Sequence, residues 1–223
     1  MDDISVILRV RNEENWLGHS IQSILDYFKH PEIIIVDNNS TDKSIKIANL
    51  FKHDTSLPFE DNRYTSVKTI SIKDYTPGKA INLGVKNATR KNILIISAHC
   101  VIKKIDSKDL FLKLVDYPAL FGKQVPHYYG KRLKPIYIWS QFSEETIINL
   151  YSKLENRYFF HNAFAFFQKS FLEKFPMNEE LVGKEDRYWA HKIVSEGFTY
   201  LYDPSFVCDH HFTEEGNTWK GIG

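Results

Sequence analysis

Along the first hundred positions, short continuous apolar runs alternate with segments in which apolar residues recur at helical spacing. This pattern predicts alternating strands and helices. A run of apolar and β-branched residues covers 5–10, and apolar residues then recur at helical spacing from Leu17 to Phe28. The next strand, 32–37, has an apolar centre without alternation, as expected when both faces of a parallel strand are covered. The pattern continues with a helix through Ile45, Ala48 and Phe51, a strand over 67–72, a helix over 79–88 and a strand over 92–96. This alternation indicates an α/β fold, in which helices flank a mostly parallel central sheet.

After about residue 105 the pattern is less regular. We expect helices over 108–115, 142–156 and 185–196, strands over 119–125 and 163–167, and a basic, aromatic loop over 127–134 that ends at Pro135. No repeat and no low-complexity linker interrupts the chain. The sequence therefore predicts a single domain over residues 1–223.

Composition narrows the class of protein. The 29 basic and 28 acidic residues nearly cancel, so we expect no nucleic-acid partner. Cys100 and Cys208 are the two cysteines of the chain, and so few thiols are more often reduced than paired, which favours the cytoplasm. The start of the chain is not typical of a signal peptide, and no window approaches the roughly 20 apolar residues of a membrane span. The aromatic content of 14% is compatible with a peripheral contact at the inner membrane.

Two positions combine a carboxylate with a defined place in the predicted fold. Glu185 and Asp186 fall in the first turn of a predicted helix, where the free N–H groups and the helix dipole favour negative charge. Such a carboxylate is a candidate general base, although an acidic residue in a first helical turn commonly does no more than compensate the helix dipole. Asp37 is the last residue of a predicted strand. At this position its carboxylate can either accept a hydrogen bond from a nucleotide base or ribose, or cap the turn that follows. The first strand is not followed by G-x-G-x-x-G, which disfavours a dinucleotide-dependent oxidoreductase.

Four segments in order along the chain resemble the signatures of family 2 glycosyltransferases with the GT-A fold. They are VILRVRNEE at 6–14, EIIIVDNNSTD at 32–42, KAINLG at 79–84, and the pair Glu185 and Asp186. The resemblance runs from about residue 4 to 212, and the segments near Tyr202 and His210 are similar to those of bacterial polysaccharide transferases of the rhamnosyltransferase-like kind. It implies a nucleotide-binding half over 1–105 and an acceptor-binding half over 106–223.

The resemblance also implies roles for individual residues. The aspartate matching Asp37 contacts the nucleotide base, and the aspartate matching Asp186 is the general base, with Glu185 orienting it or capping the helix. Residues expected to bind the donor are Arg9, Arg11, Asn12, Glu13, Asp37, Asn39, Lys79, Ser97 and His99. Residues expected to bind the acceptor are Tyr128, Arg132 and Trp189, because rings pack on sugar faces and cations pair with phosphates.

One departure from the family concerns the metal. GT-A enzymes usually carry Asp-x-Asp after the fourth strand to hold Mg²⁺ or Mn²⁺, and this chain reads Ser97-Ala98-His99 there. Hard cations prefer oxygen ligands. Three explanations stay open: Mn²⁺ bound by His99 with His211 or His210, charge neutralisation by side chains without a metal, or a donor with a single phosphate, such as a CMP-sugar. A structural zinc site built on the cysteines and histidines is the weaker alternative, because no C-x-x-C spacing occurs.

The hypothesis favoured by these residues is an inverting glycosyltransferase that moves a sugar from a nucleotide-sugar donor to a hydroxyl of a bacterial surface glycan, such as capsule or lipopolysaccharide, or of a lipid-linked glycan. UDP, dTDP, CMP and CDP donors all stay open. A nucleotidyltransferase of related fold is one alternative, although the first loop, 8–12, lacks the glycines that it would need. The other is a non-catalytic module that binds a nucleotide or glycan, because the Asp-x-Asp pair is absent.

Overall fold

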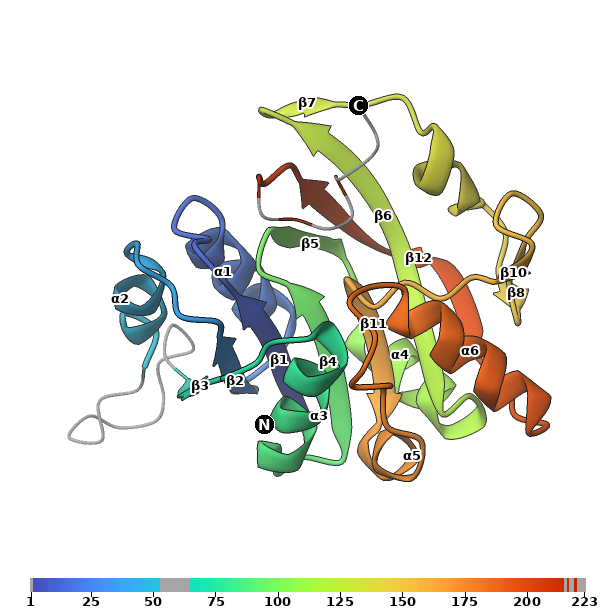
Figure 1. Ribbon diagram of the computed structural model, residues 1–223, viewed down its shortest axis with the longest axis horizontal. Coiled ribbons are helices and arrows are strands. Elements are labelled where there is room, and N and C mark those ends of the chain that lie inside the picture. The colour runs from blue at the N-terminus through green and yellow to red at the C-terminus, as the bar shows by residue number, and fades with distance from the viewer. Residues whose placement is uncertain (1, 53–64, 215, 217–218, 220–223) are drawn as a thin grey trace.

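The computed structural model describes residues 2–52, 65–214, 216 and 219. In this part of the chain, ten strands form one mixed sheet, and eight of them follow the order β3-β2-β1-β4-β11-β6-β12-β5 (Figure 1). The parallel strands at one side are β1 (Ile4–Val10), β2 (Glu32–Asp37), β3 (Ser66–Ser71) and β4 (Asn92–Ser97). The others are β5 (Cys100–Lys104), β6 (Ala119–Tyr128), β7 (Lys131–Arg132), β8 (Ile147–Ile148), β11 (Phe164–Gln168) and β12 (Leu201–His211). The predicted α/β class and single domain agree with this one continuous sheet.

The direction of β11 decides which segments meet at the edge of the sheet. β11 lies between β4 and β6 and is antiparallel to both. The start of β11 therefore lies at the same edge as the carboxyl ends of β1 and β4: Phe164 pairs with Ile96, and Arg9 pairs with Ser97. Residues that precede β11 reach the position where ligands of open α/β sheets bind.

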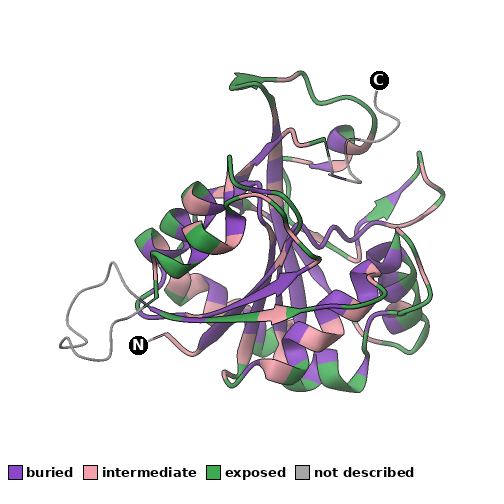
Figure 2. Cartoon of the chain, turned by 60° about the vertical axis from the view of Figure 1, so that its left-hand side comes forward, coloured by how far each residue is buried: buried purple, intermediate pink, exposed green. Residues whose placement is uncertain are grey.

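Alternate residues of the central strands pack on opposite faces of the sheet. Leu8 faces a cluster that includes α1 (Leu17–Tyr27) and α4 (Ser107–Asp116), with α2 (Ser44–Asn49) alongside. Ile7 faces a second cluster that includes α3 (Pro77–Asn87), α5 (Lys169–Lys174) and α6 (Glu185–Ser195). Both faces are covered, and the buried residues run along the strands (Figure 2). A shift of one residue would turn each strand's side chains to the other face, so the packing fixes the register.

The segment 142–156 is not helical, and the predicted helix there is wrong. It contains the short strands β8 and β9 (Tyr151–Ser152), and it lies between the 3-10 helix η1 (Tyr137–Gln141) and the strand β10 (Arg157–Tyr158). Asn149 and Asn156 both have φ of 50°, a left-handed conformation that reverses the chain and that asparagine tolerates. The backbone of Asn149 donates to the carbonyl of Tyr200 at 3.0 Å, so pairing with another segment replaces the expected helix.

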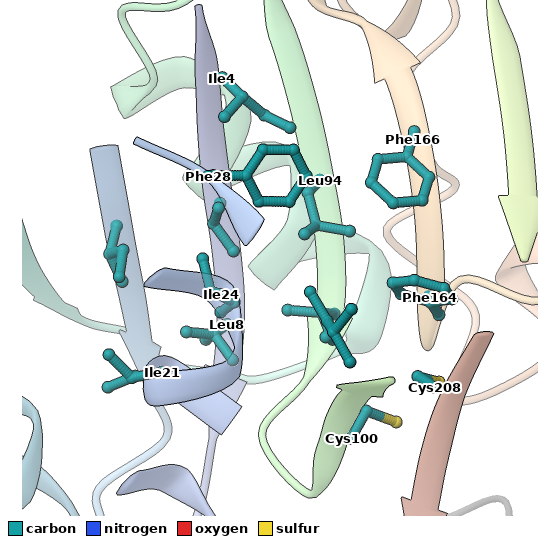
Figure 3. Packing of buried hydrophobic residues seen from close by; sticks show 14 of the residues in the cluster. Ile4, Leu8, Ile21, Ile24, Phe28, Leu94, Cys100, Phe164, Phe166 and Cys208 are labelled. Carbon is teal, nitrogen blue, oxygen red and sulfur yellow. The ribbon is translucent and has the colours of Figure 1, made fainter. Parts of the chain in front are cut away.

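The two cysteines are buried free thiols, as the composition predicts. Cys100 lies on β5 and Cys208 on the neighbouring strand β12, at the end of the apolar cluster under α1 (Figure 3). Burial and the adjacent Cys100 raise the pKa of the Cys208 thiol well above its usual range. Neither sulfur is a component of a metal cluster in the described residues, so the zinc alternative is not supported.

None of the helices in the described part of the chain is long and apolar enough to cross a bilayer.

Candidate active site

A cleft of about 540 Å³ lies at the carboxyl ends of β1 and β4, at the crossover of the sheet. This is the expected ligand position of an open α/β sheet, because the connections diverge on either side of it. Predicted site residues from three separate segments line the cleft: Arg9, Arg11, Glu13, Ser97, His99, Glu185 and Asp186. The structure therefore brings together the two ends of the predicted site, the donor segment and the acidic pair.

Asp186 is buried at the N-terminal turn of α6, which follows Lys184 in a left-handed conformation with φ of 61°. Its Oδ1 accepts from the backbone N–H of Arg187 at 2.9 Å. Its Oδ2 accepts from the Arg187 guanidinium at 2.8 Å and from the backbone N–H of Asn162 at 3.1 Å. Because a carboxylate offers about four acceptor positions, these three bonds fix the orientation of Asp186 and leave one position on Oδ1 for a ligand.

The two acidic residues have opposite pKa shifts. Burial raises the pKa of Asp186, but the charge of Arg187 and the hydrogen bonds to the carboxylate outweigh burial, and the pKa is lowered overall. Burial and repulsion from Asp186 raise the pKa of Glu185. Asp186 is therefore the member of the pair held ionised, whereas Glu185 binds protons more readily.

Arg9 and Asn162 connect the donor segment to Glu185. The Arg9 guanidinium is 3.4 Å from Glu185 Oε1 and donates to Asn162 Oδ1 at 3.2 Å. The Asn162 amide donates to Glu185 Oε1 at 2.8 Å. Sequence reasoning missed Asn162, because its position depends on β11 running antiparallel to its neighbours, which the apolar run alone does not reveal.

Of the two histidines predicted to accompany His99, His210 contacts its ring and His211 does not. His99 Nε2 lies 3.1 Å from His210 Nε2, and His99 Nδ1 lies 2.8 Å from Glu13 Oε1. Successive residues of a strand point to opposite faces, and the His211 ring stacks on Trp16 with centroids 3.7 Å apart. His210 is fully buried, so His99 and His210 form a cluster inside the protein.

The residues at the expected metal position do not fit a divalent cation. Ser97 and His99 stand where the family has two carboxylates, and both ring nitrogens of His99 already have partners. The nearby carboxylate of Glu13 is bound to that same ring. Among the described residues, no group of three or more His, Cys, Asp or Glu side chains is arranged to hold a metal. A hard cation prefers carboxylate oxygens, and at this position it would meet a hydroxyl and an imidazole ring instead.

Hydrogen bonds hold the loops after β1 and β2. Two of the predicted donor residues, Asn12 and Asp37, accept such bonds from the loop backbone. Asn12 Oδ1 accepts from the backbone of Thr41 at 2.8 Å, and Asp37 Oδ1 accepts from the backbone of Ser40 at 3.1 Å. Asn12, Asp37 and the exposed Asn39 are not among the residues that line the cleft. Their contacts to a nucleotide stay predictions, and within the chain Asn12 and Asp37 shape the two loops.

Lys79, Tyr128 and Arg132 also lie outside the lining of the cleft. Lys79 is in the first turn of α3, where its backbone N–H donates to the capping hydroxyl of Thr76 at 3.2 Å. Tyr128 and Arg132 are exposed on the β6–β7 hairpin. Their proposed contacts to substrates stay predictions.

Trp189 is not an acceptor-binding residue, because its side chain belongs to the core. It is 3% exposed, it packs beside Phe160 and Phe167, and its indole N–H donates to the carbonyl of Phe175 at 2.6 Å. The apolar face of α6 points toward the sheet, and Trp189 lies on this face.

We expect Trp189→Phe to lower the free energy of unfolding by about 1–2 kcal/mol, because the carbonyl of Phe175 loses its donor and the smaller ring leaves space. Turnover per folded molecule should stay close to that of the wild type. Urea unfolding combined with a sugar-transfer assay checks both points. A large increase in KM for the acceptor at unchanged stability would restore the acceptor role.

The chain is similar to known proteins both in sequence and in fold. The sequence model of Glycosyl transferase family 2 matches residues 5–180. The chain is 35% identical over 111 residues, 49% of its length, to an uncharacterized glycosyltransferase of Rickettsia felis. It is 30% identical over 96 residues, 41% of its length, to the minor teichoic acid biosynthesis protein GgaA of Bacillus subtilis. The matched segments span 15% and 20% of these two relatives.

Among solved structures, the fold is similar to that of S. aureus TarS 1-349 in complex with UDP-GlcNAc. The TM-score is 0.71 at 19% sequence identity, and the match covers 99% of this chain and 61% of that one. This likeness shows the α/β GT-A fold. Since the family model covers most of the residues and the fold agrees with it, the chain belongs to glycosyltransferase family 2.

Proposed function

We propose that the chain transfers a sugar from a nucleotide-sugar donor to a hydroxyl group of a glycan by inverting displacement. The observation that carries this proposal is the ionised, hydrogen-bonded Asp186 in the same cleft as Arg9 and Arg11. A fixed carboxylate can accept a proton, and guanidinium groups can offset the charge of a leaving diphosphate.

In the proposed reaction, the acceptor hydroxyl hydrogen-bonds to the remaining acceptor position of Asp186 Oδ1. As its oxygen forms a bond to the anomeric carbon, its proton moves to Asp186. The bond between that carbon and the diphosphate oxygen breaks, and the nucleoside diphosphate leaves with the electron pair. Glu185, held by Arg9 and Asn162, keeps the start of α6 in place. Much of the rate then comes from positioning.

Donor binding is proposed to be independent of a divalent metal. The support is chemical: the position of the family's two carboxylates is occupied by Ser97 and by His99, whose ring nitrogens are both engaged. Arg9 and Arg11 line the cleft and carry positive charge of their own. Guanidinium groups bind phosphate oxygens in a bidentate manner.

A bacterial surface glycan, free or lipid-linked, is the proposed acceptor. The support is the similarity to a protein of minor teichoic acid biosynthesis and an exposed edge of the molecule with fitting chemistry. Tyr129 is 72% exposed and Ile136 56%, and Lys131 and Arg132 are exposed between them. Tyr137, also exposed, lines the cleft and connects this edge to it. Aromatic and basic side chains together suit the interface of an anionic membrane, so we place the protein at the cytoplasmic face of the inner membrane.

A thermal-shift panel of UDP, dTDP, GDP, CDP and CMP, each with Mn²⁺, Mg²⁺ or EDTA, tests the donor site. We expect one nucleotide to raise the melting temperature equally in all three conditions. At about 100 times its Kd the ligand stabilises by about 2.7 kcal/mol, which corresponds to roughly 5–10 °C in a chain of this size. Inorganic sulfate is the control for nonspecific anion effects. A shift that needs Mn²⁺ would contradict metal independence, and binding without sugar transfer would favour a non-catalytic module.

A further inference from the structure

A chain of buried polar side chains runs from the donor segment to His161, the residue before Asn162. Its members are Glu13, His99, His210, Gln124 and His161, and we call it the histidine relay. The links not yet described are His210 Nδ1 to Gln124 Oε1 at 2.8 Å and Gln124 Nε2 to His161 Nδ1 at 3.1 Å. Each member is less than a tenth exposed, and Glu13, His99 and His161 line the cleft.

The proton positions in the relay follow from its ends. The backbone N–H of Ala163 can only donate, and it contacts His161 Nδ1 at 3.4 Å. Gln124 Nε2 lies 3.1 Å from the same nitrogen and 3.5 Å from the carbonyl of His161, so the Gln124 amide also donates there. His161 Nδ1 is therefore an acceptor. A neutral imidazole carries its proton on the other nitrogen, and burial, with the charge of Arg187, lowers the pKa of His161 to about 3.

The remaining protons are then determined in sequence. Because Gln124 donates through Nε2, its Oε1 accepts from His210 Nδ1–H. The fully buried ring of His210 is neutral and carries its one proton on Nδ1, so its Nε2 accepts from His99 Nε2–H at 3.1 Å. One further proton lies between His99 Nδ1 and Glu13 Oε1, 2.8 Å apart. His99 and Glu13 together therefore hold two protons and no net charge.

This arrangement has a consequence on each side of the relay. At the donor end, a neutral pair replaces the two negative charges that would attract a divalent cation. At the other end, the His161 ring has one polar atom left, the Nε2–H group, which makes no hydrogen bond within the described residues. His161 lines the cleft together with Arg9 and Arg11. An N–H donor in the same cleft as two guanidinium groups suits an anionic oxygen.

We propose that the histidine relay fixes the tautomer of His161 so that its Nε2–H donates to a phosphate oxygen of the donor, and that the relay occupies the place of a metal in this chain. The contact to the donor phosphate and the replacement of a metal rest on the proposed function. The positions of the protons in the relay concern the protein alone, and they can be tested without any ligand.

The first test is ¹⁵N NMR of the imidazole rings in the full chain without nucleotide. We expect His161 to be protonated at Nε2 only, His210 at Nδ1 only, and His99 at Nε2. A His161 ring protonated at Nδ1, or a His210 ring protonated at Nε2, would overturn the relay. Added Mn²⁺ should broaden the signals of His99 and His210 no more than those of the exposed His191, and selective broadening would establish a metal site instead.

The second test separates the donated hydrogen bond from the fold. His161→Met removes the donor, whereas His161→Gln keeps an N–H group of similar reach. Since a hydrogen bond to a charged group contributes about 1.5–3 kcal/mol, we expect the methionine variant to bind the selected nucleotide of the panel roughly 10- to 100-fold more weakly. The glutamine variant should stay within about threefold of the wild type. Equal affinity in both variants, with the expected tautomers in the wild type, would reject the phosphate contact and leave the relay intact. A wild type that binds no nucleotide would instead reject the proposed function.

Discussion

Asp186→Asn is expected to lower kcat by roughly 10²- to 10⁴-fold while the Kd for the donor stays within about twofold of the wild type. In the proposed reaction the carboxylate of Asp186 accepts the proton of the attacking hydroxyl, and an amide at this position could not accept it. In the proposed complex the donor phosphates are held by Arg9 and Arg11, which line the cleft and which the substitution leaves unchanged. Single-turnover sugar transfer and equilibrium titration of the nucleotide measure the two quantities.

Glu185→Gln is the matched control for this substitution. The pKa of Glu185 is raised by burial and by Asp186, so the neutral amide resembles a form that this side chain readily adopts. Its contacts to Arg9 and Asn162 position the turn, and we expect a smaller loss of kcat. Wild-type turnover in Asp186→Asn together with a severe loss in Glu185→Gln would reassign the base to Glu185.

The pH dependence of turnover follows from the same assignment. Because the pKa of Asp186 is below its ordinary value, the base is ionised throughout the neutral range. The acidic fall of kcat/KM caused by this group should therefore lie below the pH at which an ordinary aspartate titrates.

Arg187→Met is expected to lower the free energy of unfolding by about 3–5 kcal/mol at neutral pH, since it leaves the buried carboxylate of Asp186 without its counter-charge. The Arg187 guanidinium is 2.8 Å from Asp186 Oδ2 and 3.6 Å from Glu155 Oε2. It also donates to the carbonyl of Phe160 at 3.1 Å. Urea unfolding measures the loss, and Lys192→Met on the exposed face of the same helix is the control.

The effect of Arg187→Met should depend on pH in a defined direction. A carboxyl group whose pKa is lowered in the folded state stabilises the protein above its unfolded pKa, and this contribution is lost as the pH falls through the folded value. The pKa of Asp186 is lowered in this way by Arg187. The difference between wild type and variant should therefore be largest at neutral pH and shrink toward acid pH. An equal loss at both would indicate that stacking of Arg187 on Phe159 dominates, rather than charge.

The parts of the fold that hydrophobic periodicity determines were predictable. β1, β2, α1 and α6 begin and end close to the expected residues, because each buries one continuous face or run. The segment 142–156 was not predictable in this way, because its apolar residues are divided between the core and the surface. Leu150 is 8% exposed, whereas Leu154 is 58% exposed. β12 was missed because polar residues such as Asp203 and His210 interrupt its apolar pattern, although both are buried by specific partners.

The candidate site was predictable where one segment carries a signature, and not where contacts join distant segments. Arg9, Glu13, His99 and Asp186 line one cleft as expected. Asn162, which the signatures do not include, reaches the site through the reversed direction of β11. Strand direction and pairing follow from the packing of the whole sheet, and a single sequence does not contain this information locally.

The order of strands in the sheet also bears on how such a protein can be divided or recombined. β5 belongs to the first 105 residues, yet it pairs with β12 near the other end of the chain, and β4 pairs with β11. A fragment limited to those residues would carry the signature segments of the donor side but would present bare strand edges, which invite association with other chains. The expected halves 1–105 and 106–223 are therefore not separate folding units. A chimera made from two related proteins would have to take both sides of the sheet from the same protein.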